Sequence, residues 1–310
     1  MSTSKWIFST SFLRIGGAAV LLALFGCDPA PVKPTEPVLT EPQLMAAAES
    51  AEKSGDTGRA LLDYVKAAAA NPKSAEPHYR VGHIHTQLGN TAPAQQAFAR
   101  ALALNPNHVG ALEGLGLLCL EQGQPEDATH LLNRALTLDP SRWRSGNGLG
   151  VLADLIGEHD KAQAYFSQAL KTAPGQPELL NNLGYSYYLS GKLPEAQNYF
   201  EQALAKAPGY KTAWSNLALL RVRKGDAGGA VDAFGESLKP YQAYNNVGYL
   251  LYMQGDLDKA KDYLQRAIAL SPSYYSLAQD NLRRVEAEAD SKAQATKAAK
   301  SNKSKAAATR

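Results

Sequence analysis

The chain has 310 residues, of which 45% are hydrophobic and 20% charged, and its formal net charge is +3. This length and composition are ordinary for a soluble globular protein of one or two domains. The small charge excess is no footprint of nucleic-acid binding, which needs a basic patch. The two cysteines, Cys27 and Cys119, predict neither a structural disulfide nor a cysteine-based metal site, because Cys27 lies beside a predicted processing site.

Residues 1–26 have the layout of a secretory signal peptide. Lys5 and Arg14 are their only charged residues, residues 15–25 are apolar, and the small Gly26 closes the segment. A membrane-spanning helix needs about 20 apolar residues, so this run is too short to be one. The sequence therefore predicts a cleaved signal at 1–26.

The four residues LFGC at 24–27 resemble a bacterial lipobox, in which the cysteine receives a diacylglycerol and becomes the mature N-terminus. The resemblance implies lipidation of Cys27, with palmitate among the acyl chains, and a protein lipid-anchored to a membrane of the bacterial envelope, facing the periplasm. Two or more acyl chains anchor a protein firmly. The alternative is an ordinary signal peptide with an incidental cysteine. Asp28 resembles the inner-membrane retention signal of enterobacterial lipoproteins, but the choice between inner and outer membrane stays open.

Residues 27–42 follow as a lipidated cysteine and a proline-rich linker. The segment DPAPVKPTEPVLTEP holds five prolines, which favour an extended spacer between membrane and folded body.

Small residues then recur with a fixed period through the rest of the chain. Glycines are spaced by 34 residues and finally by 30: Gly55, Gly89, Gly123, Gly157, Gly191, Gly225 and Gly255. A period of 34 residues is the signature of tetratricopeptide repeats, each of which is a pair of antiparallel helices. One pair cannot bury its apolar face alone, so neighbouring pairs must stack. The sequence predicts an all-α fold, a right-handed superhelical solenoid of about seven repeats plus a C-terminal capping helix.

The seven predicted blocks are 41–74, 75–108, 109–142, 143–176, 177–210, 211–240 and 241–274. In the fifth block, we predict helices at 177–190 and 193–207, with Gly184 and Ala196 small enough for close approach. The sixth block is four residues short, which predicts a local change in the superhelical angle. Residues 275–289 look like an amphipathic capping helix, so the solenoid spans 43–289. Residues 290–310 predict a basic disordered tail.

Catalytic motifs are missing from the sequence. It contains no HExxH, no GxSxG and no phosphate-binding glycine loop, so we predict no enzyme and no cofactor. His78 and His85 share one face of a predicted helix with His83 nearby, but no cysteine accompanies them, and we predict no metal site. Cys119 falls at a core-facing position, which favours a buried, inert thiol.

The first helix of each block is expected to line the concave face. Asparagine can pair with the backbone of a bound peptide, and tyrosine suits an interface. Blocks five to seven carry both residue types at groove-facing positions, although asparagine there can also be structural. The predicted partner-binding groove contains Asn181, Asn182, Tyr185, Tyr188, Asn216, Arg223, Asn245, Asn246, Tyr249 and Tyr252. The expected partner is a peptide segment or helix of another protein, and not nucleic acid.

The segments NNLGYSYYLSGKLPEAQNYFEQAL, TAWSNLALLRVRKGD and DNLRRV resemble the TadD lipoproteins of tight-adherence (Flp) pilus systems. These share a lipobox, a repeat array and a C-terminal helix. The resemblance implies a lipid-anchored scaffold that assists assembly of a tight-adherence pilus or its secretin. The alternative is an adaptor lipoprotein for type IV pilus assembly or for cell-wall hydrolases. A catalytic domain has no room outside the repeats, given ordinary domain sizes.

Overall fold

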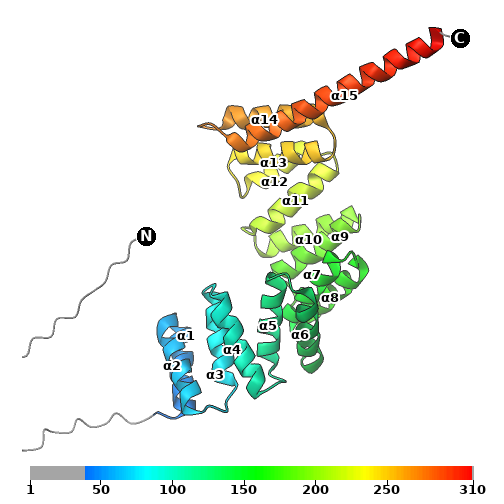
Figure 1. Ribbon diagram of the computed structural model, residues 1–310. Helices are drawn as coiled ribbons and strands as arrows, with labels where there is room; N and C mark the ends of the chain where they lie inside the picture. The colour runs from blue at the N-terminus through cyan, green and yellow to red at the C-terminus, as the bar shows by residue number, and fades with distance from the viewer. Residues whose placement is uncertain (1–38, 309–310) are drawn as a thin grey trace, which may run out of the picture. The chain divides into compact units, whose positions relative to one another are not determined.

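The computed structural model describes residues 39–308, with side chains to residue 297, and in this range it contains fifteen α-helices and no strand. The helices follow one another as seven pairs and a final long helix (Figure 1). Their bounds are α1 (Glu41–Lys53), α2 (Thr57–Ala70), α3 (Glu76–Gln87), α4 (Thr91–Leu104), α5 (Val109–Glu121), α6 (Pro125–Leu138), α7 (Trp143–Leu155), α8 (His159–Thr172), α9 (Pro177–Leu189), α10 (Leu193–Lys206), α11 (Lys211–Arg223), α12 (Ala227–Gly235), α13 (Pro240–Met253), α14 (Leu257–Leu270) and α15 (Ser276–Ala308). The prediction of an all-α solenoid is confirmed.

The two helices of each pair play different parts in the stack. We call the odd-numbered helices α1 to α13 the A helices and their even-numbered partners the B helices. Each A helix packs against its own B helix, and successive A helices also contact one another from α3 onward. Successive B helices scarcely touch. The A helices therefore lie on the inner side of the stack, as the sequence predicts.

Every A helix ends in the same kind of turn. Gly191 follows α9 with φ of 80°, a left-handed conformation that costs glycine no steric strain. The backbone N–H of Gly191 donates to the carbonyl oxygen of Tyr188 at 3.1 Å, and that of Lys192 donates to Tyr187 at 2.9 Å. The periodic glycines of the other pairs adopt the same positive φ. These turns reverse the chain and start each B helix.

Small residues bring the helices of a pair together. A Cβ atom on Gly184 would lie 2.8 Å from Cδ1 of Phe200 and 3.2 Å from the carbonyl oxygen of Ala196. Ala196 and Phe200 are completely buried. Only glycine lets α9 approach α10 this closely, so the predicted role of Gly184 is confirmed.

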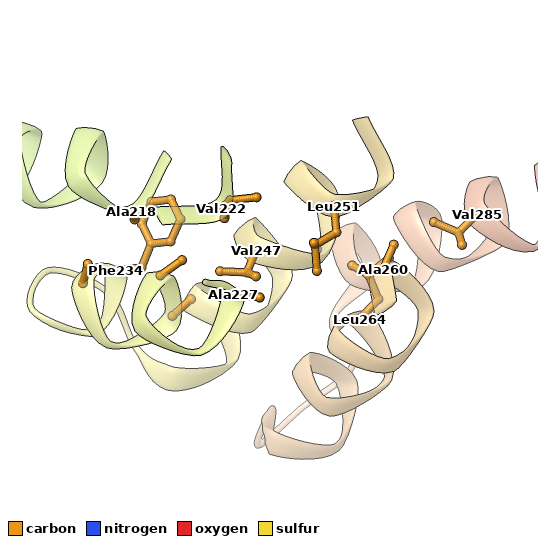
Figure 2. Packing of buried hydrophobic residues seen from close by; sticks show 12 residues of the cluster. Ala218, Val222, Ala227, Phe234, Val247, Leu251, Ala260, Leu264 and Val285 are labelled. Atoms are coloured by element: carbon orange, nitrogen blue, oxygen red, sulfur yellow. The ribbon is translucent and has the colours of Figure 1, made fainter. Parts of the chain in front are cut away.

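The apolar core continues from one pair to the next. Figure 2 shows its C-terminal part, where Val222, Phe234, Val247 and Leu264 of four successive helices pack in one cluster. Val285 of α15 joins this cluster and is 1% exposed. The last helix therefore covers the apolar end of the stack, as a cap must.

Two elements depart from the regular pattern. Helix α12 has 9 residues, whereas the other B helices have 14, because block six lacks four residues. Helix α15 continues to Ala308, where the sequence predicts a disordered tail from residue 290. Alanine and lysine, which dominate this segment, have high helix propensity and permit a helix without packing partners. The predicted signal peptide, the linker and Cys27 fall outside the described residues, apart from the linker's last four positions.

Candidate protein-binding surface

Apolar side chains lie exposed along the A helices. They occupy the ninth and thirteenth positions of the repeat, which are one helical turn apart and share one face. We call this set the A-helix stripe: Leu117, Val151, Leu155, Tyr185, Leu189, Tyr249 and Met253. Leu155 is 71% exposed and Met253 64%. Leu117 and Val151 are half-buried, and α11 has no exposed apolar residue at these two positions, so the exposed part of the stripe lies on α7 and α9 and again on α13. Exposed apolar surface marks interaction sites on soluble proteins.

Cavities open along the stripe. One of about 300 Å³ lies between α7 and α9, and four stripe residues line it: Val151, Leu155, Tyr185 and Leu189. A second, of about 320 Å³, lies against α5, α7 and α9, where Arg144, Asn147 and Glu178 supply polar groups beside Leu117 and Val151. A third, of about 350 Å³, extends the series to α3. Such pockets accept side chains of a bound segment.

The predicted tyrosines divide into two kinds. Tyr185 and Tyr249 are 37% and 38% exposed and belong to the stripe. Tyr188 is half-buried: its ring centroid lies 5.9 Å from that of Tyr185 and 4.9 Å from Cζ of Arg223. Arg223 also donates from Nη1 to the carbonyl oxygen of Tyr188 at 2.7 Å, which links α11 to α9. Tyr188 and Arg223 thus help to hold two repeats together beside the exposed Tyr185.

Tyr252 is tied to the capping helix. The nearby carboxylate of Glu288 on α15 raises the pKa of the Tyr252 hydroxyl. Its ring centroid lies 6.3 Å from that of Tyr249. Tyr249 is therefore the member of this pair that is most available to a partner.

The predicted groove asparagines mostly bond to one another. Asn216 donates from Nδ2 to Oδ1 of Asn181 at 2.8 Å, and Asn181 donates to Asn182 at 3.2 Å. Asn182 donates to Asn147 at 2.9 Å, and Asn147 donates to Glu178 at 2.8 Å. This asparagine ladder runs from α11 through α9 to α7.

The ladder changes the assignment of two residues. Asn181 and Asn245 are each 2% exposed, so neither presents its amide to a partner. Asn245 instead accepts from Asn281 of α15 at 3.1 Å and donates to Asn246 at 3.3 Å. The burial of both residues favours the structural role that the sequence left open over a role in binding. Asn182 and Asn246 are half-exposed and remain accessible at the edge of the stripe.

The sequence did not lead us to expect the aliphatic members of the stripe on the binding face. Leu155, Leu189 and Met253 stand at the thirteenth position, four residues after groove-facing ninth positions. The repeat period places them on the binding face, but their residue type alone suggests core. Comparing equivalent positions in successive blocks could have found them.

The cysteine and histidine candidates show no reactive arrangement. Cys119 is 5% exposed, and burial raises the pKa of its thiol, which disfavours the reactive thiolate. His83 lies 3.8 Å from Oε1 of Glu52 and lines the cavity beside α3. Across the part of the chain that the structure describes, no three His, Cys, Asp or Glu side chains are grouped to hold a metal ion. In the same residues, no helix has an apolar stretch of the length that a bilayer crossing requires.

Three models of known protein families match parts of this chain. A family model of the cilia and flagella-associated protein 70 middle TPR-like domain matches residues 44–178. Two tetratricopeptide-repeat models match residues 177–210 and 241–274. No curated protein matches the sequence.

Similar solved structures share the fold. The structure of the APC/C hetero-tetramer Cut9-Hcn1 contains a chain that superposes on this one with a TM-score of 0.60 at 20% sequence identity. The match covers 77% of this chain and 48% of that chain, so this protein spans about half the length of that relative. PilF of Pseudomonas aeruginosa has a TM-score of 0.53 to this chain at 21% identity, and the match covers 69% of this chain and 97% of PilF. PilW has a TM-score of 0.50 at 19% identity, and the match covers 79% of this chain and 97% of PilW. With its seven helix pairs and periodic glycine turns, the chain is a tetratricopeptide-repeat protein, a scaffold for protein–protein interaction.

Proposed function

We propose that this protein is a lipid-anchored scaffold of the bacterial cell envelope that assists assembly of a tight-adherence (Flp) pilus or its secretin. It does so by binding a segment of a pilus or secretion component along the A-helix stripe, and it performs no catalysis. The observation that carries the binding role is the exposed apolar stripe, whose aromatic members are Tyr185 and Tyr249. The pilus role rests on the sequence resemblance to TadD lipoproteins.

The stripe can supply the binding energy. Burial of a leucine or methionine side chain contributes about 1.5–3 kcal/mol, and the stripe exposes Leu155, Leu189 and Met253. Tyrosines add rigid contact area with a polar tip, which is why they are enriched among the residues that dominate interface energies. The polar groups of Arg144 and Glu178 at the neighbouring cavity would orient the bound segment.

The anchor rests on the lipobox-like LFGC and the proline-rich linker behind it. Lipidation would hold the scaffold at the periplasmic face of a membrane, with the linker as spacer. Replacing Cys27 with serine should release the protein from the membrane fraction and abolish labelling by radioactive palmitate. If the variant stays in the membrane fraction and is still labelled, the lipid anchor is refuted, but the binding role of the stripe is not.

The second candidate is type IV pilus assembly. PilW, described as a widely conserved type IV pilus biogenesis factor, has a similar fold at a TM-score of 0.50. An adaptor for cell-wall hydrolases is the remaining alternative from the sequence. The three proposals share the stripe and differ in the partner.

Photo-crosslinking in the native envelope separates them. A photoreactive residue is placed at Tyr185 or Tyr249, with a matched control at Gln265, which is exposed on the B helix α14. Capture of a tight-adherence secretin or pilus component at the two stripe positions, and not at Gln265, is the expected result. Capture of a type IV pilus protein or of a hydrolase would replace the proposed partner. Crosslinks from Gln265 alone would show that the stripe is not the binding surface.

A further inference from the structure

A cleft of about 360 Å³ opens between the B helices α6 and α8. Leu149, Leu152 and Ala153 of α7 line it, together with Tyr165 of α8. Its lining also includes charged residues of α6 and α8 and the 70%-exposed Ile156. It shares no residue with the three cavities along the A-helix stripe. It is therefore a separate site on the other side of the helix pairs.

The next repeat shows what fits in this place. Counting 34 residues on, Ala153 corresponds to Tyr187 and Tyr165 to Tyr199. Those two rings are stacked, with centroids 5.4 Å apart and an angle of 5° between their planes. The cleft of block four thus lies where block five places a tyrosine ring from its own chain.

Other residues close the equivalent place in block five. Gln163 donates from Nε2 to Oγ of Ser190 at 3.1 Å. At the cleft the equivalent positions are Thr129 of α6 and Ile156 after α7, which cannot form that bridge because isoleucine has no polar side-chain atom. In block six the counterpart of Ala153 is Arg221, which reaches across to the carbonyl oxygen of Gly229 at 2.7 Å. Block four has a methyl group where blocks five and six have long side chains.

The rim position after the glycine turn differs in sign between the two blocks, although Lys161 in block four and Glu195 in block five make the opposite exchange. In block five, Nζ of Lys192 lies 5.6 Å from the ring centroid of Tyr187, a cation–π contact. The counterpart of Lys192 in block four is Glu158, whose carboxylate accepts from Lys161 at 3.0 Å. Glu126 adds a second carboxylate on the α6 side of the cleft. Lys161 already occupies the carboxylate of Glu158, so Glu126 is the rim carboxylate that would attract a cation carried next to a bound ring.

We infer that the cleft between α6 and α8 binds an aromatic side chain of a partner protein, with a neighbouring lysine or arginine. The ring stacks on Tyr165 over Leu149 and Leu152, as Tyr187 stacks on Tyr199, and the cation meets Glu126. This is a second docking point on the scaffold. It does not depend on the A-helix stripe or on the identity of the partner bound there.

Three small phenols test the inference on the full chain: tyramine, p-cresol and 4-hydroxyphenylacetate. They share the ring and differ in charge. With methyl-labelled protein, NMR titration should give saturable shifts at Leu149, Leu152 and Ile156. Tyramine should bind at least several-fold more tightly than p-cresol, and 4-hydroxyphenylacetate most weakly. Shifts scattered over the surface, or the reverse charge order, would overturn the inference.

Variants complete the test. Ala153→Tyr supplies the ring from the chain itself and should weaken tyramine binding at least tenfold. If this variant fails to fold by circular dichroism, the double variant Thr129→Gln with Ile156→Ser rebuilds the bridge of block five from the cleft surface. Tyr185→Ala in the A-helix stripe is the control and should leave tyramine binding unchanged. If tyramine binds a folded variant with a closed cleft as tightly as it binds the unmodified protein, the phenols bind elsewhere.

Discussion

At the scale of single residues, Glu76 shows how one side chain links α3 to His108, the residue that caps the start of α5. His108 accepts the backbone N–H of Ala111 on Nδ1 at 3.1 Å, so its Nε2 carries the proton and donates to Oε2 of Glu76 at 3.0 Å. Arg80 donates to Oε1 of the same carboxylate at 2.7 Å. The hydrogen bond from His108, followed by that from Arg80, lowers the pKa of Glu76 against the opposing effect of burial.

This arrangement predicts a dependence of stability on pH. Because the folded pKa of Glu76 lies below its ordinary value of 4.5, the ionised carboxylate stabilises the fold above that pH. The contribution is lost as the pH falls through the folded pKa. Glu76→Gln should therefore lower the free energy of unfolding at about pH 7 and reduce its further loss towards about pH 3.5. Urea unfolding at several pH values measures both effects.

The control is Asp262→Asn, which changes an exposed carboxylate on α14. It should leave the slope of stability against pH close to that of the unmodified protein. The same slope in the Glu76 and Asp262 variants would show that the link between Glu76 and His108 contributes nothing in solution.

Residue environments could be predicted where the repeat period determines them. Gly184 stands at a position whose equivalents are glycine or alanine in the other blocks, and it is buried as expected, as is Cys119. The buried state of Asn181 could not be predicted. An amide at that position can bond a peptide or the asparagine of the next repeat, and the choice depends on side-chain geometry that the period does not contain.

At the scale of elements, the asparagine ladder is the principal polar link between A helices. It matters because asparagine amides buried without partners would destabilise the stack by about 1–3 kcal/mol each. Asn181 sits at its centre, accepting from Asn216 of α11 and donating to Asn182 of its own helix. The ladder explains why these A helices tolerate asparagine at positions that face their neighbours.

Removal of the central amide should loosen this link. We expect Asn181→Ala to lower the free energy of unfolding by about 1–3 kcal/mol, because Asn216 loses a buried acceptor. Asn246→Ala is the matched control, since Asn246 is half-exposed and its bond to Asn245 is long, at 3.3 Å. Thermal and urea unfolding compare the two variants. Equal losses of stability in both would mean that the ladder adds nothing beyond an ordinary surface amide.

Element boundaries were largely predictable, and the exceptions have a physical cause. From the periodic glycines and closing prolines, the sequence predicted the ends of α9 and α10 to within one residue of their positions in the structure. The C-terminal end of α15 was not predictable in the same way. Its last part has the composition of a disordered tail but also the high propensity of an alanine–lysine helix, and composition alone does not choose between them.

At the scale of the whole array, stability is a sum over pairs and their interfaces. Block six weakens that sum at one point. Helix α12 has 9 residues and contains Gly228, Gly229 and Gly235. Block six has Ser215 at the position of Asn181, and Asn245 of the next A helix bonds forward to Asn281 of α15. The polar links between A helices are therefore interrupted at block six, whereas the apolar cluster that includes Phe234 continues across it.

Native-state hydrogen exchange tests this weak point. Amides of α12 should exchange faster than those of α10 and α14, because local opening there breaks the fewest interactions. Gly228 and Gly235 have open space around their Cα atoms, so alanine fits at both. Replacing a glycine in a helix by alanine stabilises it by about 0.5–1 kcal/mol. The double variant should therefore slow exchange in α12 selectively. Uniform protection across α10, α12 and α14 before substitution would show instead that the short block transmits cooperativity undiminished, and that the solenoid unfolds as one unit despite the missing turn.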